Sequence, residues 1–361
     1  MSQAPRDPRG LLALALTLFG CASTTIRRGA TSQSDFERRL EERRIALQIP
    51  GFSAAITNGA AIVWAKGFGL ADVEAKAPAT PTTVYHMASL TKPVAATILL
   101  QLVEEGKLSL DDPVSRFGIT LQGPGIIRVR HLLTHTSEGI PGSAYNYNGN
   151  RFSLLDSVIT RLTGESFANR LEAKIRRPLR LERTAPNPAA ARAFAATGMD
   201  RDRFIQMMAR PYEQQNGVAR QINYPTSFST AAGLVSTALD YAEFSIAMDT
   251  NAFLKPETTA LAYTPALSTS GDTLPYGLGW FSTRVNGQRV VWHYGYWTGN
   301  SSLVIKVPAR GISFVIMANS DMLSRPTSLG SGDLMSSTIA REFINAFVVG
   351  NTALPAKPIA R

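Results

Sequence analysis

The chain has 361 residues, and at about 150 residues per domain this length predicts two domains. Hydrophobic residues make up 44% and charged residues 18%, which allows a large core, and the single cysteine excludes an intramolecular disulfide or a cysteine-based metal cluster. The net charge of +10 is compatible with nucleic-acid binding, but the basic residues are scattered and lack interleaved aromatic side chains, so we expect no nucleic-acid partner.

The first 20 residues have the features of an export signal. Arg6 and Arg9 precede a continuous apolar run at 11–19, which is shorter than the roughly 20 residues of a membrane-spanning helix. The run ends in Leu-Phe-Gly-Cys, which resembles the lipobox of bacterial lipoproteins. The resemblance implies a signal peptide at 1–20, a lipid anchor on Cys21 and an exported, periplasmic lipoprotein tethered to the outer membrane. The alternatives are an ordinary cleaved signal or an uncleaved anchor.

A helix is predicted after a polar linker at 21–34. Ser34 or Asp35 can cap its N-terminus, its apolar side runs to about Gln48, and Pro50 ends it. Its arginines alternate with glutamates, which is typical of a solvated helix face and not of a nucleic-acid surface.

Six β-prone runs form three predicted hairpins, two of which turn at Asn-Gly, the strongest short hairpin signal. The runs span 52–57 and 60–68, 278–285 and 288–293, and 301–307 and 312–318. Helical patterns span 94–105, 153–163, 166–176, 237–249 and 333–347. These patterns predict a mixed α/β fold of the α+β type, with an antiparallel sheet of five or more strands, terminal helices and an inserted, mostly helical domain. The predicted boundaries are 35–92 and 226–350 for the sheet domain, 93–225 for the helical domain and 351–361 for a tail.

The run Ser89-Leu-Thr-Lys92 is the first candidate catalytic motif. Residues i and i+3 share a face of a helix, so the Lys92 ammonium can reach the Ser89 hydroxyl. A serine at a helix N-terminus also lies near unpaired N–H groups, which suits a nucleophile that must then hold an oxyanion. In the structural alternative Ser89 caps the helix and Lys92 faces solvent.

Two further motifs add candidate residues. The loop at 143–149 is rich in tyrosine, and a phenol becomes a usable base where adjacent cations lower its pKa; the alternative is a loop whose tyrosines only pack. His293-Tyr294-Gly295 ends a predicted strand, where the glycine permits close approach of a ligand. Tyr296 and Trp297 can wall a pocket there.

Metal and cofactor sites have weaker support. His131 and His135 lie four residues apart and could bind zinc from one helix face, but a zincin helix has glutamate after the first histidine, and Leu132 stands there. Gly67 and Gly69 lack the third glycine and the helix of a dinucleotide-binding fingerprint. We therefore expect neither a metal nor a cofactor.

Several segments resemble one known family in composition and order. They are YHMASLTKP at 85–93, HLLTHTSEG at 131–139, TGESF at 163–167, RPLRLERT at 177–184, STAAGLVSTALDYAEF at 229–244, YGLGW at 276–280, HYG at 293–295 and MANSD at 317–321. Over about residues 35–345 the chain resembles the serine β-lactamase and penicillin-recognising superfamily, specifically class C β-lactamases, D,D-peptidases and family VIII esterases. The family fold agrees with the hairpins and helices predicted above.

The resemblance implies a role for each motif. Ser89 corresponds to the nucleophile, Lys92 to the group that helps to deprotonate it, and Tyr147 to the tyrosine of the Y-x-N motif. His293-Tyr294-Gly295 corresponds to the K-T-G or H-x-G strand, and the N–H groups of Ser89 and Tyr296 to the oxyanion hole. An ester or amide carbonyl would acylate Ser89 and water would release the acyl group.

Three residues depart from the family pattern. Gly149 replaces the asparagine of Y-x-N, His293 stands where many β-lactamases have lysine, and Glu138 is an extra residue within T-H-T-S-G. In the family, loss of the asparagine weakens the case for β-lactam or D-Ala-D-Ala turnover more than the case for ester hydrolysis, and the change at His293 is common in esterases and D-peptidases. We expect an esterase or β-lactamase-like hydrolase of small esters or β-lactams. The alternatives are a D,D-carboxypeptidase or D-aminopeptidase of peptidoglycan peptides, and a non-catalytic, lipid-anchored binding protein.

Overall fold

The computed structural model describes residues 1, 32–350, 352–354 and 358–359. The predicted signal peptide after Met1, Cys21 and most of the predicted tail lie outside the described residues. Residues 32–350 all belong to one compact unit, and the boundaries predicted for two domains within it stay a prediction. None of the described helices is long and apolar enough to cross a membrane.

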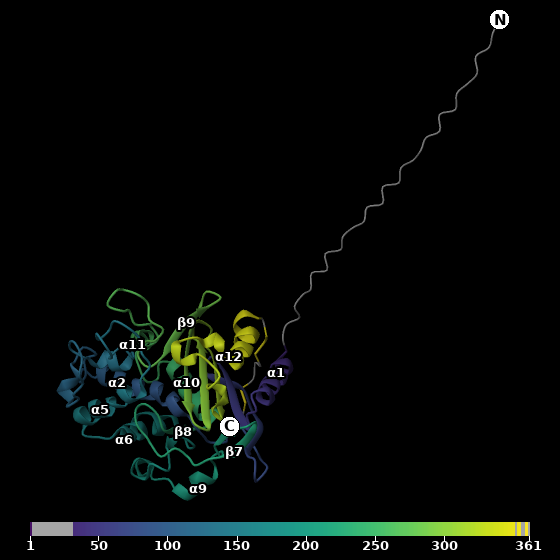
Figure 1. The fold of residues 1–361 in the computed structure, drawn as a ribbon, viewed down its shortest axis with the longest axis horizontal. Coiled ribbons are helices and arrows are strands. Elements are labelled where there is room, and N and C mark those ends of the chain that lie inside the picture. The colour runs from purple at the N-terminus through teal and green to yellow at the C-terminus, as the bar shows by residue number, and fades with distance from the viewer. Residues whose placement is uncertain (2–31, 351, 355–357, 360–361) are drawn as a thin grey trace. The chain divides into compact units, whose positions relative to one another are not determined.

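The centre of this unit is a seven-stranded antiparallel sheet in the order β3-β2-β1-β12-β11-β10-β9 (Figure 1). The strands are β1 (Gly51–Asn58), β2 (Ala61–Asp72), β3 (Ala77–Pro78), β9 (Phe281–Val285), β10 (Gln288–Trp297), β11 (Asn300–Val307) and β12 (Ile312–Ala318). All three predicted hairpins are present as the pairs β1–β2, β9–β10 and β11–β12. Because β1 also pairs with β12, the two sequence ends of the unit join in the middle of the sheet.

Side chains that alternate along the strands build a separate core on each face of the sheet. In β1, Phe52 and Ile56 belong to one apolar cluster and Ala55 to the other, as the period of two in a strand requires. Phe36 of α1 (Gln33–Ala46) and Phe343 of α12 (Thr338–Phe343) cover the first face. The two terminal helices therefore flank the sheet as predicted.

The second face packs against α2 (Thr91–Glu104) and α10 (Ala238–Asp249). The other helices lie between and after these two: α3 (Val129–Leu133), α4 (Gly149–Ser153), α5 (Leu155–Thr163), α6 (Phe167–Leu171), α7 (Arg177–Leu179), α8 (Ala191–Phe194), α9 (Arg201–Gln206) and α11 (Pro256–Ala262). The mostly helical middle of the chain is therefore present, although the short α3, α4 and α7 to α9, as well as α11, were not predicted.

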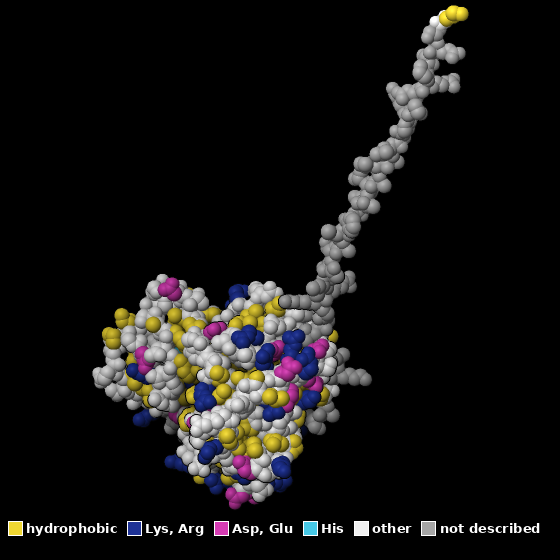
Figure 2. All heavy atoms as spheres, turned by 45° about the vertical axis from the view of Figure 1, so that its right-hand side comes forward, with side chains coloured by type: hydrophobic (Ala, Val, Ile, Leu, Met, Phe, Trp, Pro, Cys, Tyr) yellow, Lys and Arg dark blue, Asp and Glu magenta, His cyan; other side chains and the backbone are white. Residues whose placement is uncertain are grey.

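Helix α1 begins two residues earlier than expected. Ser32, and not Ser34 or Asp35, is the N-cap, and Asp35 at the third helical position completes a capping box. The arginines of α1 pair with acids, for example Arg44 with Glu41 at 2.6 Å and Arg43 with Glu342 at 2.7 Å. Lys and Arg side chains likewise lie among Asp and Glu side chains on the face shown in Figure 2.

A second, small sheet was not predicted. Its strands β4 (Tyr85–His86), β8 (Leu234–Ser236) and β5 (Ala185–Pro186) are only two or three residues long, too short for a periodic signal. The pairing of β4 with β8 brings the segment before residue 234 beside the segment after residue 86. This pairing places the main elements of the candidate site.

Candidate active site

Ser89 lies in a tight turn between β4 and α2. The residue before it, Ala88, has a φ of 49°, a left-handed conformation that costs energy for a residue with a Cβ. The turn is held from two sides, because Ser302 donates to the carbonyl of Met87 at 2.7 Å and Thr91 donates to that of Ala88 at 2.8 Å. The fold therefore maintains a strained backbone at the predicted nucleophile.

Lys92 is fully buried and does not face solvent. Its Nζ donates to Ser89 Oγ at 3.0 Å and to the carbonyl oxygen of Ala231 at 2.9 Å. Burial lowers the pKa of Lys92 from 10.5 to about 7, since no carboxylate compensates the desolvation. The uncharged amine is therefore accessible at neutral pH, with its nitrogen at hydrogen-bond distance from the serine.

Tyr147 lies against the same lysine. Lys92 Nζ is 4.9 Å from the centre of the Tyr147 ring. The Tyr147 hydroxyl is buried and has no hydrogen-bond partner among the described residues. Burial raises the pKa of Tyr147 well above 10, and a smaller effect of the neighbouring Ser89 opposes it. The lowered phenol pKa that we expected from adjacent cations is therefore not found, and Tyr147 is a protonated phenol at neutral pH.

His135 supports the tyrosine loop and is not placed to share a metal with His131. His131 lies in α3, whereas His135 follows the end of that helix with a φ of 55°. The His135 ring packs at a tilt against Tyr147 with ring centres 4.3 Å apart, and its Nδ1 accepts from the N–H of Asn148 at 3.1 Å. No group of three or more potential metal ligands occurs among the described residues.

His293 is buried beneath the site as a neutral imidazole. Its Nδ1 is 2.7 Å from the carbonyl oxygen of Tyr294, which can only accept, so Nδ1 carries the proton. Nε2 then accepts from the hydroxyl of Tyr276 at 2.8 Å. Burial and the nearby Lys92 hold the pKa of His293 well below 6.5. At neutral pH this histidine cannot supply the positive charge that a lysine would.

Gly295 lets β10 approach the nucleophile turn. A Cβ on Gly295 would lie 2.1 Å from the carbonyl oxygen of Met87, so any side chain there would separate the two segments. β9 pairs with β10 only as far as Trp292, so residues 293–297 lack a pairing strand on this side, although His293, Tyr294 and Gly295 are buried. Tyr296 and Trp297 on this edge are partly exposed, which fits their predicted place in the wall of the site.

Gly149, the first residue of α4, leaves space beside Lys92. A Cβ built on it would lie 3.9 Å from Lys92 Nζ, an ordinary contact distance. A side chain at this position would therefore touch the lysine. With glycine at position 149, the Lys92 amine donates to Ser89 Oγ and to the main-chain oxygen of Ala231.

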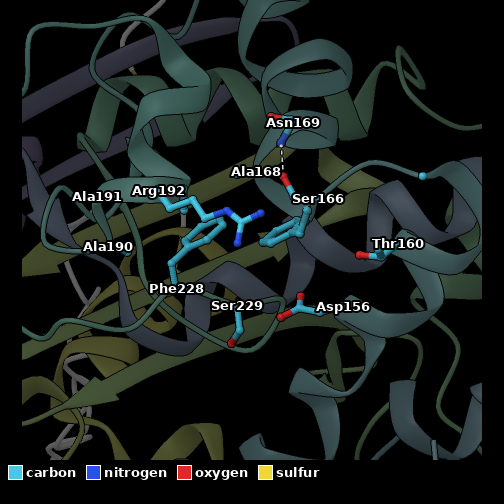
Figure 3. A pocket seen from close by; sticks show the side chains of 13 residues that line it. Asp156, Thr160, Ser166, Ala168, Asn169, Ala190, Ala191, Arg192, Phe228 and Ser229 are labelled. Atoms are coloured by element: carbon cyan, nitrogen blue, oxygen red, sulfur yellow. Dashed lines mark hydrogen bonds between the residues drawn. The ribbon is translucent and has the colours of Figure 1, made fainter. Parts of the chain in front are cut away.

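A pocket of about 740 Å³ has Phe228 and Ser229 in its lining (Figure 3), close in sequence to Ala231, whose carbonyl oxygen binds Lys92. Its lining includes Asp156 of α5, Ser229, and the rings of Phe167 and Phe228, which stack with centres 5.1 Å apart. Asp156 accepts from the N–H of Thr230 at 2.9 Å, and burial raises its pKa to about 6. The lining of this pocket contains neither Ser89 nor Lys92, so the pocket is not itself the candidate active site.

A family model described as Beta-lactamase matches residues 36–327. Curated relatives include Protein flp of Staphylococcus aureus (strain MW2), 24% identical over 329 residues that cover 80% of this chain and 63% of that protein. Penicillin-binding protein 4* of Bacillus subtilis (strain 168) is 24% identical over 307 residues, 73% of this chain and 67% of that protein. The chain thus spans less than two thirds of the first relative's length.

Solved structures share the fold. The octameric penicillin-binding protein homologue from Pyrococcus abyssi matches 90% of this chain and 79% of its own, at a TM-score of 0.74 and 24% identity. A D-stereospecific amidohydrolase from Streptomyces sp. matches 88% and 99%, at a TM-score of 0.67 and 22% identity. EstCE1, a hydrolase with promiscuous acyltransferase activity, matches 86% and 97%, at a TM-score of 0.66 and 20% identity.

The fold is shared with a penicillin-binding protein homologue, a D-stereospecific amidohydrolase and a hydrolase with promiscuous acyltransferase activity. The match over residues 36–327 shows that the chain belongs to the Beta-lactamase family. The superfamily and the fold class predicted from sequence are confirmed.

Three residues that contact Lys92, Tyr147 or His293 were not predicted to belong to the site. Ala231 contributes only a main-chain oxygen, which no side-chain pattern can reveal. Tyr276 stood within the family segment YGLGW, but its hydrogen bond to His293 depends on the fold. His135 was considered as a metal ligand and as part of the family segment at 131–139, and its contact with Tyr147 could not be inferred from spacing.

Proposed function

We propose that the chain is a serine hydrolase that forms an acyl-enzyme on Ser89, with small esters or β-lactams as substrates. The observation that carries the proposal is the buried Lys92 amine, 3.0 Å from Ser89 Oγ and with a pKa lowered to about 7. An uncharged amine at this distance can accept the serine proton, which is how a neighbouring base activates a weak nucleophile.

The reaction would proceed in two balanced steps. Ser89 Oγ attacks the carbonyl carbon while its proton moves to Lys92 Nζ, and the N–H groups of Ser89 and Tyr296 stabilise the oxyanion. The Tyr147 hydroxyl then gives its proton to the leaving oxygen or nitrogen and regains one from Lys92. In the second step water replaces the leaving group, the proton moves in the opposite direction, and the carboxylic acid is released from Ser89.

Two features favour an ester over an amide. Gly149 contributes no side-chain amide to hold a substrate amide or the lysine, and His293 is a buried neutral imidazole without charge for a substrate carboxylate. A leaving alcohol also depends less on protonation than a leaving amine. We therefore rank small acyl esters first and β-lactams second among the substrates of this site.

D-amino-acid peptides are the alternative class of substrate, ranked after esters and β-lactams. The relative named Penicillin-binding protein 4* and the fold shared with a D-stereospecific amidohydrolase favour this alternative. Residues 293–297 of β10 lack a pairing strand on the side of β9, so an extended peptide could pair with this edge. A D,D-carboxypeptidase or D-aminopeptidase would fit this arrangement.

We further propose that the protein is exported and held at the outer membrane by a lipid on Cys21, since a lipobox-like sequence precedes this cysteine. Metabolic labelling with a radioactive fatty acid should mark the wild type and leave Cys21→Ser unlabelled. Labelling of both, or of neither, would contradict the anchor.

Parallel turnover assays test the hydrolase proposal. The substrates are a short-chain p-nitrophenyl ester, a chromogenic cephalosporin and a D-Ala-D-Ala peptide, with Ser89→Ala as the control. We expect the ester to be turned over fastest and Ser89→Ala to lose this activity. A wild type that turns over none of the three and is not labelled by a fluorophosphonate would favour a non-catalytic binding protein.

A further inference from the structure

Glu138 contacts the loop that carries Tyr147. Its carboxylate accepts hydrogen bonds from the side-chain amides of Asn146 and Asn148, the second at 2.6 Å. These asparagines are the two sequence neighbours of Tyr147. We propose that Glu138 is a positioning residue that fixes the Tyr147 hydroxyl relative to Ser89. The inference rests on the catalytic role of Tyr147 in the proposed function.

The Tyr147 loop is held at several points. The Tyr147 hydroxyl is buried beside Ser89 without a well-formed hydrogen bond. Its ring packs against His135, Phe281 and Tyr294, and the carbonyl of His135 accepts from the N–H of Asn146 at 2.8 Å. These contacts do not include the side-chain amide nitrogens of Asn146 and Asn148, which both donate to Glu138.

The carboxylate also sets the orientation of the Asn148 amide. Glu138 takes the amide nitrogen, so the amide oxygen is left to accept from the N–H of Arg151 at 3.0 Å and to cap α4. A carboxylate accepts at both oxygens and therefore satisfies two amide donors at once. Glutamine would present its own NH₂ to one of them. The arrangement thus requires the charged, acceptor-only side chain and not merely its shape.

Glu138 acts through other residues and does not touch the reacting atoms. Its recorded hydrogen bonds go only to the two asparagines, and its side chain is half-buried at the rim of the loop. Loss of this contact should therefore misplace the phenol by a fraction of an ångström without blocking substrate binding. Such misplacement reduces kcat and leaves KM nearly unchanged.

The test compares Glu138→Ala and Glu138→Gln with the wild type in ester turnover, with active sites titrated by a fluorophosphonate. We expect kcat per titrated site to fall about tenfold in both variants, with KM within about twofold. Glu42→Gln is the matched control, because Glu42 bonds an arginine on the exposed side of α1, and it should match the wild type. An unchanged kcat in Glu138→Ala would overturn the proposal.

A double-mutant cycle separates positioning from general destabilisation. The Asn146 side chain donates to Glu138, so Asn146→Ala should cost little more once Glu138 is alanine. If Glu138→Ala and Asn146→Ala instead reduced kcat by independent factors that multiply in the double variant, the proposal would be contradicted. Retention of turnover in both Ser89→Ala and Tyr147→Phe would instead refute the proposed function. If those two variants are inactive and Glu138→Ala is unaffected, only the positioning role fails.

Discussion

The amine of Lys92 lies between Ser89 Oγ at 3.0 Å and the carbonyl oxygen of Ala231 at 2.9 Å, 139 residues away in the sequence. The carbonyl can only accept, so it orients one N–H of the lysine and leaves the side of the nitrogen nearest Ser89 for proton exchange. The role of Lys92 as the base can therefore be tested by substitution.

The Lys92→Met substitution should remove the amine that acts as the base and keep an unbranched apolar side chain in its place. We expect ester turnover to fall about 100-fold or more. Because burial holds the folded-state pKa of Lys92 near 7, below its unfolded value of 10.5, the charged lysine opposes folding at and below neutral pH. Thermal unfolding at pH 6 should therefore show a higher Tm for Lys92→Met. A lower Tm would contradict the burial argument.

The wild-type pH profile follows from the same group. If Lys92 must be uncharged to accept the serine proton, kcat/KM for an ester should rise with pH and level off above about 7. Stopped-flow measurements of the acylation burst between pH 5 and 9 would locate this limb. A profile that is flat across this range would exclude Lys92 as the titrating base.

Tyr147→Phe removes only a hydroxyl that has no hydrogen-bond partner among the described residues. We expect about a 100-fold loss of ester turnover and an unchanged or slightly raised Tm, since an unpaired buried polar group is lost. Tyr263→Phe is a suitable control, because its hydroxyl is also buried and without a recorded hydrogen-bond partner but lies outside the candidate site. Near-normal activity in Tyr147→Phe would show that another residue moves the proton.

Gly149→Asn would place a side-chain amide against Lys92. The glycine φ is not left-handed and its Cβ position is 3.9 Å from Lys92 Nζ, so the backbone accepts the substitution. We expect the ratio of cephalosporin to ester turnover to rise several-fold, because the amide can orient both lysine and substrate. Gly149→Ala fills space without the amide and should not raise the ratio. An equal rise in both variants would refute the explanation.

The burial of Asp156 predicts that the free energy of unfolding decreases as the pH rises. Burial raises its folded-state pKa from 3.8 to about 6, so its ionisation costs folding free energy as the pH rises from about 4 to 6. Asp156→Asn keeps an oxygen for the N–H of Thr230 without the charge. Denaturant unfolding should show it more stable than the wild type by about 1–3 kcal/mol at pH 7.5 and nearly equal at pH 4. A variant that is less stable at pH 7.5 would contradict this reading.

Much of the sheet could be predicted from sequence because its signals are local. Asn286-Gly287 forms the turn of one predicted hairpin, and both residues adopt the positive φ that such a turn requires. The hairpin predicted to turn at Asn58-Gly59 turns one residue later, at Gly59-Ala60, because Asn58 still pairs with Ala61 at the end of β1. The small second sheet escaped prediction because its strands are two or three residues long. The N-cap of α1 was predicted at Ser34 or Asp35 but is Ser32, because each of these three polar residues can serve as an N-cap.

The family, the hairpin pairs and the spacing that puts Ser89 and Lys92 on one helical face could all be inferred from local sequence patterns. The chemistry of these side chains depends on the folded chain. Burial of Lys92 lowers its pKa, burial of Tyr147 raises its own, and His293 stays neutral, because each pKa depends on desolvation by segments distant in the chain. The contact of Glu138 with the tyrosine loop is likewise set by folding, since no periodic pattern relates one loop to another.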